Sequence, residues 1–301
     1  MSNILPVFTG LSAFPLTPAD ENGRVDTAAL QELLERIIAG KAHSIGLLGS
    51  TGTYAYLTRE ERRRAVDTAV ECVAGRLPII VGIGAIRTDM AQALARDAEA
   101  AGADALLMAP VSYTPLTQDE AFHHYATVAA TTGLPLAIYN NPSTTHFAFT
   151  PELLQRLSAI KTIRAVKMPA PADADFAAEL HQLRAKTSLG FAVGYSGDWH
   201  TGNALLAGAD GFYSVVAGLL PNPAAALAKA ASSGNASETA RIDAMFAPLW
   251  TLFREHGSLR IIYAAMNLLG ISDASPPLPL MQPAPDLWPR IEAAIAALPE
   301  A

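Results

Sequence analysis

Cysteine is almost missing from this sequence: Cys72 is the only one in 301 residues. No disulfide can form within one chain and no metal cluster built from several thiolates can form, so we expect a reducing, cytoplasmic environment. The sequence also lacks an uninterrupted apolar run of the roughly 18 residues that a membrane-spanning helix needs. Its N-terminus has no basic segment followed by a long apolar stretch, so we predict no signal peptide.

Charge is scarce as well. Charged residues make up 16% of the chain and the net charge is −7. The one basic run, Arg62-Arg63-Arg64, follows two glutamates and is typical of a solvated helix face. This composition argues against a nucleic-acid partner. Half of the residues are hydrophobic, which suits a sizeable buried core.

What the sequence does contain is a regular alternation of short apolar runs with longer segments of helical spacing. Eight runs are predicted as strands: 7–14, 44–49, 78–84, 105–110, 135–140, 163–167, 190–195 and 211–216. Helices are predicted between them, among others at 28–38, 59–73, 91–101, 119–131 and 176–183. Asp26, Thr58 and Thr150 precede three predicted helices as N-cap residues.

Eight strands that each lead into a helix are typical of an α/β protein with a parallel (β/α)8 barrel of the TIM type, which uses about 250 residues. An open doubly wound sheet is disfavoured because Phe14-Pro15-Leu16-Thr17-Pro18, rather than a glycine fingerprint, follows the first strand. We predict a barrel over residues 1–224. Residues 225–301 are rich in alanine and are predicted to form a C-terminal helical extension, interrupted at Gly257 and Pro276-Pro277.

Lys167 and Tyr139 each close a predicted strand, at the end of a barrel where active sites lie. A lysine at the end of an apolar strand must reach water, pair with a carboxylate, or lose its proton. In the last case it is a nucleophile that can form an imine with a carbonyl substrate, and a nearby phenol can carry protons. Taken singly, each residue has a simpler explanation, since lysine stems are often buried with the ammonium in solvent and tyrosines are common in cores.

Gly49-Ser50-Thr51-Gly52 follows the second predicted strand and therefore belongs to the same end of the barrel. Two hydroxyls and several backbone N–H groups between flexible glycines can bind a carboxylate. An ordinary strand-to-helix loop explains this segment equally well when it is considered alone.

These segments resemble the dihydrodipicolinate synthase and N-acetylneuraminate lyase superfamily, and the resemblance covers nearly the whole chain. The motifs that carry it, in chain order, are Gly49-Ser50-Thr51-Gly52, Tyr139-Asn140-Asn141-Pro142, Val166-Lys167, Ser196-Gly197-Asp198 and Gly208-Ala209-Asp210-Gly211. Each motif is weak alone, and together they are fairly specific. The resemblance implies a (β/α)8 barrel with a C-terminal helical region, and a homotetramer or dimer. It also implies a lyase that needs no metal or other cofactor and handles pyruvate or another 2-oxo acid through a lysine imine.

The resemblance assigns roles to individual residues. Lys167 matches the Schiff-base lysine and Tyr139 the tyrosine that shuttles protons. Ser50 and Thr51 match the pair that holds the carboxylate of the 2-oxo acid. The main-chain carbonyl of Tyr213 matches the group that contacts the imine, and Gly197 lies in a motif expected to line the substrate site.

Two positions, Thr144 and Ser112, depart from the dihydrodipicolinate synthase pattern, and both are candidate substrate-binding residues together with Tyr113. Thr144 stands where those synthases carry an arginine that grips the second substrate's carboxylate. Ser112 stands where they carry a tyrosine lent across a subunit interface, although Tyr113 is adjacent. Losing the arginine removes a bidentate carboxylate clamp. We therefore expect an enzyme other than dihydrodipicolinate synthase.

The main functional hypothesis is a Schiff-base lyase or aldolase that makes or breaks a carbon–carbon bond between a 2-oxo acid and an aldehyde or sugar acid. Alternatives are 4-hydroxy-tetrahydrodipicolinate synthase, with Tyr113 and another cation compensating, and a 2-keto-3-deoxy sugar acid dehydratase. A non-catalytic barrel that binds a 2-oxo acid is a further alternative, although binding alone requires neither Lys167 nor Tyr139. Trp199 and His200, near the end of the seventh strand, are weaker candidates for contacts with the second substrate.

Overall fold

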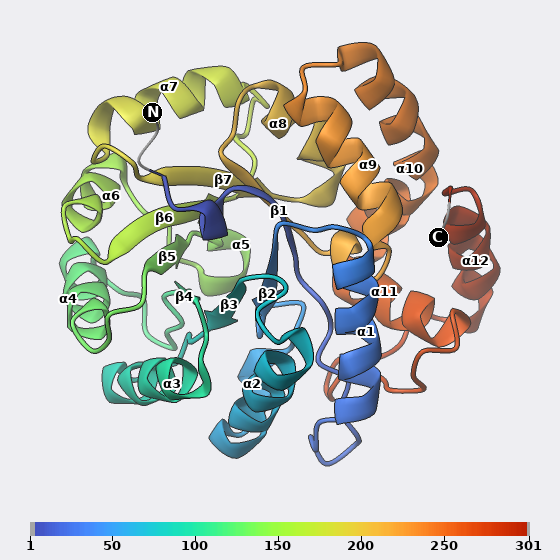
Figure 1. The fold of residues 1–301 in the computed structure, drawn as a ribbon, viewed down its shortest axis with the longest axis horizontal. Helices are drawn as coiled ribbons and strands as arrows, with labels where there is room; N and C mark the ends of the chain where they lie inside the picture. The colour runs from blue at the N-terminus through green and yellow to red at the C-terminus, as the bar shows by residue number, and fades with distance from the viewer. Residues whose placement is uncertain (1–3, 300–301) are drawn as a thin grey trace.

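The structure, a computed structural model, describes residues 4–299. Its centre is a closed barrel of eight parallel strands, hydrogen-bonded in chain order with the last strand pairing with the first (Figure 1). The strands are β1 (Gly10–Ala13), β2 (Ser44–Leu47), β3 (Ile79–Gly82), β4 (Ala105–Met108), β5 (Leu136–Tyr139), β6 (Ile163–Met168), β7 (Ala192–Ser196) and β8 (Gly211–Ser214). The predicted (β/α)8 barrel is therefore confirmed.

A ring of helices surrounds the barrel. It consists of α1 (Thr27–Ala39), α2 (Arg59–Val73), α3 (Thr88–Ala101), α4 (Gln118–Ala129), α6 (Pro151–Ser158), α7 (Phe176–Lys186), α8 (Thr201–Leu206) and α9 (Pro221–Ser232). Asp26, Thr58 and Thr150 accept hydrogen bonds from backbone N–H groups in the first turns of α1, α2 and α6, so the three predicted N-caps are confirmed. A short helix, α5 (Pro142–Thr145), follows β5 directly.

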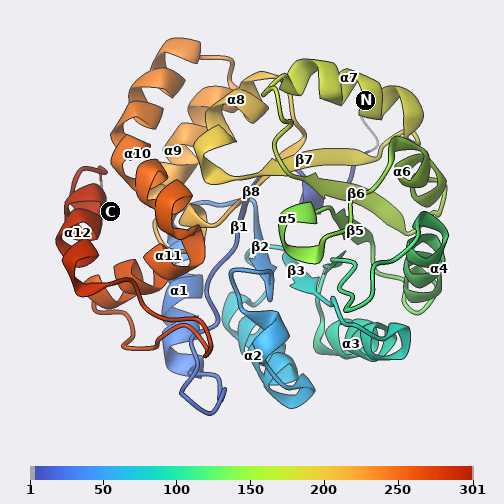
Figure 2. The same cartoon turned by 180° about the vertical axis from the view of Figure 1, so that it is seen from behind.

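The C-terminal region is helical, as predicted, and consists of α10 (Ala236–His256), α11 (Ser258–Leu268) and α12 (Trp288–Ala296). Gly257 separates α10 from α11 with a φ of 83°, a left-handed conformation that favours glycine. Pro221 begins α9, which packs against β1, α1 and α8 and so completes the ring. The predicted division at residue 224 falls inside this helix, and it stays a prediction. In Figure 2, α5 lies beside β5 and β6 at the end of the barrel where the strands finish.

Short 3-10 turns join several of these elements: η1 (Pro6–Phe8), η2 (Tyr54–Tyr56), η3 (Asp198–His200), η4 (Val216–Gly218) and η5 (Pro285–Leu287). The first predicted strand, 7–14, is shortened by such a turn. Pro6 begins η1, and Gly10 has a φ of 71°, so extended pairing starts only at Gly10.

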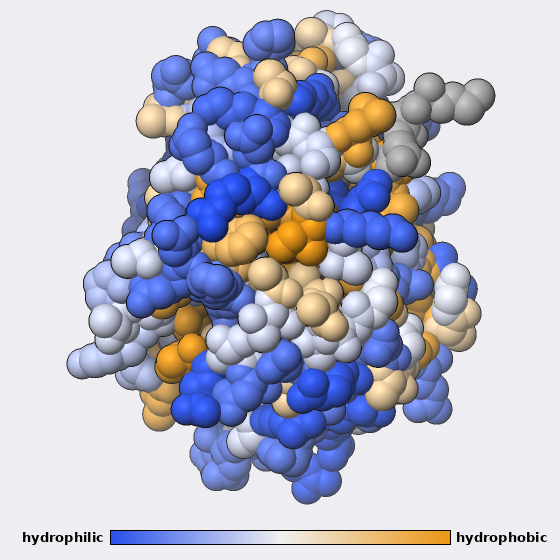
Figure 3. Space-filling model, turned by 90° about the vertical axis from the view of Figure 1, so that its left-hand side faces the viewer, coloured by the Kyte–Doolittle hydropathy of each residue, from blue (hydrophilic) through white to orange (hydrophobic). Residues whose placement is uncertain are grey.

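The outer surface carries mostly polar side chains. The face that includes α4 and α6 is largely hydrophilic, with apolar side chains gathered near its middle (Figure 3). Among residues 4–299, no helix combines the length and the apolar character needed to cross a bilayer.

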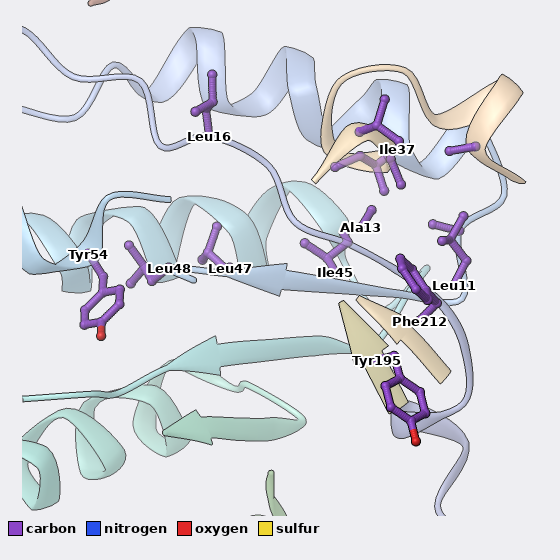
Figure 4. Close-up of a cluster of buried hydrophobic side chains, with 14 of the residues drawn as sticks. Leu11, Ala13, Leu16, Ile37, Ile45, Leu47, Leu48, Tyr54, Tyr195 and Phe212 are labelled. Carbon is purple, nitrogen blue, oxygen red and sulfur yellow. The ribbon is translucent and has the colours of Figure 1, made fainter. Parts of the chain in front are cut away.

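Two cores hold the barrel together. The larger one lies between the strands and the helices, where side chains such as Ile45 and Leu47 of β2 point outward (Figure 4). The smaller one fills the barrel itself, where alanines and glycines on several strands leave room for four rings. These rings belong to Phe8, Phe14, Tyr139 and Tyr213. Side chains alternate between the two cores along most of the strands, with a break at the start of β6, where Ile163 and Ala165 lie in different cores.

Candidate active site

A cavity of about 650 Å³ opens at the C-terminal ends of the strands. Its walls come from the segments after β2, β5, β6, β7 and β8 and from residues of the C-terminal region. A neighbouring hollow of about 810 Å³ shares Thr53, Tyr56 and Leu280 with it, but its walls do not include Lys167 or Tyr139. The chemistry expected from the sequence therefore lies in the first cavity.

Lys167 reaches this cavity from inside the barrel wall. On β6, Val166 and Met168 pack in the outer core and Ala165 in the inner one, so the lysine between them points inward. Its side chain is buried, and the residue is 5% exposed. Strand pairing places Tyr139 of β5 directly opposite Lys167 of β6. The expected meeting of amine and phenol is thus present in the structure.

Tyr139 has its phenol oxygen fixed by two donors. The Ser50 hydroxyl donates to this oxygen at 3.4 Å, and the Asn141 amide Nδ2 donates at 3.1 Å. Because the oxygen accepts both bonds, its own hydrogen is left to point elsewhere. Sequence reasoning did not single out Asn141, although it lies within the Tyr139-Asn140-Asn141-Pro142 motif.

The turn after β2 brings Ser50 and Thr51 to the cavity wall, as expected. Thr53 has a φ of 50°, and it lines the neighbouring hollow together with Tyr263 of α11. Burial raises the pKa of Tyr263 to about 12, so it stays a neutral phenol near pH 7. The C-terminal region therefore lies near the segment that follows the predicted carboxylate-binding turn, a proximity that no local sequence signal indicates.

Gly197 and Asp198 form the corresponding corner after β7. Gly197 has a φ of 97°, which lets the chain turn sharply into η3. Asp198, 2% exposed, accepts hydrogen bonds from the Ser214 hydroxyl at 2.6 Å and from the backbone N–H of Val216 at 3.1 Å. Burial raises the pKa of Asp198, and these bonds oppose that effect. The carboxylate joins the ends of β7 and β8, a role that the sequence did not reveal.

Tyr213 of β8 contributes its ring to the interior of the barrel. Its buried phenol oxygen has no hydrogen-bond partner within the described residues, and burial raises its pKa. Only the main-chain carbonyl of Tyr213 was expected to matter. The ring lies 5.6 Å from the Lys167 Nζ, measured to its centroid, so the side chain also belongs to the site.

The outer part of the cavity contains hydroxyls and apolar side chains. Thr144 of α5 lines it, as do Trp199 and His200 of η3. Burial lowers the pKa of His200, which leaves its imidazole neutral at pH 7. Leu259 and Leu280, from the C-terminal region, also line this part and were not predicted. Lys167 and His200 are the only basic side chains in the described lining.

Ser112 and Tyr113 lie away from this cavity in the described chain. Tyr113 is 95% exposed, and the Ser112 hydroxyl donates to the carbonyl oxygen of Thr114. Their predicted contact with substrate stays a prediction, and it requires a neighbouring subunit.

Comparison with known proteins decides the family. The model of the dihydrodipicolinate synthetase family matches residues 7–298. The chain belongs to this family. Among solved structures, dihydrodipicolinate synthase from Agrobacterium tumefaciens is 60% identical, with a TM-score of 0.96 over 97% of this chain and 98% of that one. The pyruvate complex of the Acinetobacter baumannii synthase is 27% identical, with a TM-score of 0.88 over 96% of this chain and 98% of that one.

Curated relatives of this chain also support its membership of the dihydrodipicolinate synthetase family. The 4-hydroxy-tetrahydrodipicolinate synthase of Alcanivorax borkumensis is 33% identical over 92% of both chains, and that of Acidiphilium cryptum is 33% identical over 97% of this chain and 99% of that one. Family members are class I lyases and aldolases that form a lysine Schiff base, so the chain is an enzyme of this class. The names of these relatives do not support the expectation that the chain is something other than that synthase.

Proposed function

We propose that the chain binds pyruvate or a related 2-oxo acid as an imine on Lys167 and makes or breaks a carbon–carbon bond next to it. The observation that carries this proposal is the position of the lysine amine. It is buried at the cavity floor beside Tyr139, and it forms no ion pair within residues 4–299. An amine without a carboxylate partner is free to react with a ketone when it is neutral.

The chemical steps follow from this arrangement. The neutral amine of Lys167 adds to the ketone carbon, and loss of one water with uptake of one proton gives an iminium ion. Its positive charge acidifies the adjacent carbon, which loses a proton to form an enamine. The enamine then adds to an aldehyde; in the reverse direction, cleavage of the carbon–carbon bond releases the aldehyde and leaves the enamine on Lys167, which is then protonated at carbon. In either direction, addition of water to the final iminium releases the 2-oxo acid product and a proton and restores the amine. Tyr139 is the proposed proton carrier, and the donors Ser50 and Asn141 would stabilise its oxygen whenever it gives up a proton.

Ser50 and Thr51 are proposed to bind the carboxylate of the 2-oxo acid. Both line the cavity, and the Ser50 hydroxyl also reaches Tyr139. Fixing the carboxylate at this turn would orient the ketone toward Lys167 and reduce the entropy cost of the bimolecular step. Gly197 and the main-chain carbonyl of Tyr213 are proposed to complete the wall around the imine.

Borohydride trapping tests the imine. With pyruvate and borohydride, the peptide that contains Lys167 should gain the mass of the reduced adduct. Lys167→Ala should abolish the gain, while Lys161→Ala, an exposed lysine just before the same strand, should not change it. A folded wild-type chain that gives no adduct, or one that is labelled only at other lysines, contradicts the proposal.

We further propose that the second substrate is an aldehyde or sugar acid without a carboxylate at its far end. Thr144 replaces a clamp that could bind such a group, and the outer cavity offers hydroxyls, Trp199 and a neutral His200 instead. Hydroxyl groups on a sugar-derived acceptor can hydrogen-bond with these side chains. The alternative is 4-hydroxy-tetrahydrodipicolinate synthase, which the names of the relatives favour.

A comparison of acceptors distinguishes these two functions. Aspartate semialdehyde and an uncharged hydroxyaldehyde of similar length are each supplied with pyruvate, and kcat/KM is measured for both. We expect the uncharged aldehyde to be preferred. Thr144→Arg should shift the ratio toward aspartate semialdehyde by about 10-fold or more, since a hydrogen bond between charged groups contributes roughly 1.5–3 kcal/mol. Efficient turnover of aspartate semialdehyde by the wild-type enzyme would establish the synthase instead.

We propose that the chain forms a homodimer or homotetramer. Tyr113, Ile86 and Met90 are exposed on the neighbouring segments after β3 and β4, where a second copy could cover them. Sedimentation velocity should give a mass of two or four chains, and a monomer at micromolar concentration contradicts this proposal. Cytoplasmic location stays a prediction from the single cysteine.

A further inference from the structure

Three aromatic rings surround the amine of Lys167. Its Nζ lies 4.1 Å from the ring centroid of Phe14, 4.1 Å from that of Tyr139 and 5.6 Å from that of Tyr213. A buried lysine is ordinarily paired with a carboxylate, and none pairs with this one in the described chain. The buried Asp198 carboxylate interacts electrostatically with Lys167 without pairing with it. In direct contact with the nitrogen, a positive charge meets the faces of the rings.

Phe14 is held firmly in its place. It is 1% exposed at the end of β1, and its ring meets that of Tyr213 edge-to-face, with centroids 5.9 Å apart. Gly46 and Gly49 leave the space that it occupies. A Cβ on Gly46 would lie 2.2 Å from the Phe14 ring, and a Cβ on Gly49 would lie 2.6 Å from it. The ring is thus positioned before any substrate arrives.

We propose that Phe14, together with the rings of Tyr139 and Tyr213, forms an aromatic cage that stabilises the positive charge of the iminium formed on Lys167. The proposal rests on the imine chemistry proposed above. The free lysine ammonium is a compact, strongly hydrated cation, and a buried cage of aromatic rings stabilises such an ion poorly. The iminium carries one N–H and shares its charge with the adjacent carbon, so it depends less on water and is well suited to ring faces.

This makes Phe14 a catalytic residue that contacts the reacting nitrogen without donating or accepting a proton. Its contribution is electrostatic, through the negative face of the ring. The competing explanation is that Phe14 only fills the barrel, as Phe8 does at the opposite end. Both are buried in the inner core, but no contact of Phe8 with the Lys167 amine exists within residues 4–299.

The test compares Phe14→Leu with Phe8→Leu, the same substitution in the same core. For each folded variant, the rate of borohydride trapping is measured over a range of pyruvate concentrations. Competition by lactate, which has the carboxylate but cannot condense with an amine, is measured in parallel. In Phe14→Leu we expect half-maximal trapping to need about 2- to 30-fold more pyruvate. Lactate should bind within about twofold of the wild type, and Phe8→Leu should change neither value by more than that.

A second series of variants tests the proposal even if the Phe14→Leu variant does not fold. Phenylalanine carrying one, two or three fluorine atoms is incorporated at position 14, which weakens the negative ring face at almost constant size. The pyruvate requirement should rise step by step with fluorination. A flat series, or equal effects of Phe14→Leu and Phe8→Leu, overturns the cage and leaves the imine intact. A wild-type enzyme without any adduct overturns the cage and the proposed function together.

Discussion

Tyr139 combines two properties that can be separated experimentally. Its ring lies over the Lys167 nitrogen, with the centroid 4.1 Å away, while its oxygen is held by Ser50 and Asn141. The ring is suited to supporting charge, and the oxygen is suited to moving protons. A substitution that removes only the oxygen therefore isolates the second property.

We predict that Tyr139→Phe retains the pyruvate adduct and loses proton transfer. Exchange of the pyruvate methyl hydrogens for deuterium, followed by NMR in D₂O, should slow by about 10²–10⁴-fold. Tyr195→Phe is the matched control, because that phenol lies on the outer side of β7 against Phe176 of α7. Exchange at the wild-type rate in Tyr139→Phe would assign the proton transfer to another group.

Elements of the barrel differ in how well the sequence predicts them. The caps at Asp26, Thr58 and Thr150, the strand order and the inward direction of Lys167 follow from local signals and from the period of a strand. The contact between Phe14 and Lys167 could not be predicted. It requires Gly46 within β2, Gly49 just after β2, and the closure of β8 onto β1. Leu259 and Leu280 were missed for a similar reason, since the segments that bring them to the cavity carry no chemical motif.

At the scale of a single element, β2 can lie close to the Phe14 ring because residue 46 is a glycine. Adding one methyl group there should push the ring away from the Lys167 amine, because the nearest ring atom would be only 2.2 Å from the new Cβ. We predict that Gly46→Ala lowers the free energy of unfolding by about 1–3 kcal/mol, the usual cost of overpacking. Urea denaturation measures this change.

Gly133→Ala is the control for that experiment, since a Cβ there would meet only Glu99 at 3.9 Å. It should leave stability unchanged or raise it by less than about 1 kcal/mol. If both alanine variants unfold at the same urea concentration, the tight packing of Phe14 against β2 is wrong.

At the scale of the whole molecule, ion pairs run between successive helices of the outer ring. Arg76, just after α2, pairs with Glu35 of α1, Arg59 of α2 with Asp97 of α3, Arg156 of α6 with Asp119 of α4, and Lys186 of α7 with Glu152 of α6. Exposed pairs of this kind contribute little individually. Their sum depends on pH because the carboxylates of several pairs have lowered pKa values.

Asp97 illustrates the sign of this dependence. Its hydrogen bonds with Arg59 lower its pKa below the unfolded value of 3.8. The unfolded chain therefore takes up the proton first as the pH falls, and the stabilisation present above this value is lost below it. We predict that Asp97→Asn unfolds at a lower temperature than the wild type at pH 7, with a smaller difference at about pH 3.

Asp286→Asn, a change at an exposed carboxylate in no ion pair of the described chain, is the control. Thermal unfolding of the three proteins, followed by circular dichroism across this pH range, measures the effect. A difference between Asp97→Asn and wild type that grows toward acid would refute the assignment.

The cavity is layered in depth, with the lysine and its rings inside the barrel and Thr144, Trp199, Leu259 and Leu280 above them. Choice of the second reactant and activation of the first can therefore be engineered separately. A library randomised at the upper positions can be screened with borohydride, so that every clone still able to capture pyruvate is retained. The retained clones can then be sorted by the aldehydes they accept. Capture of pyruvate and choice of the aldehyde are thus selected in two successive steps.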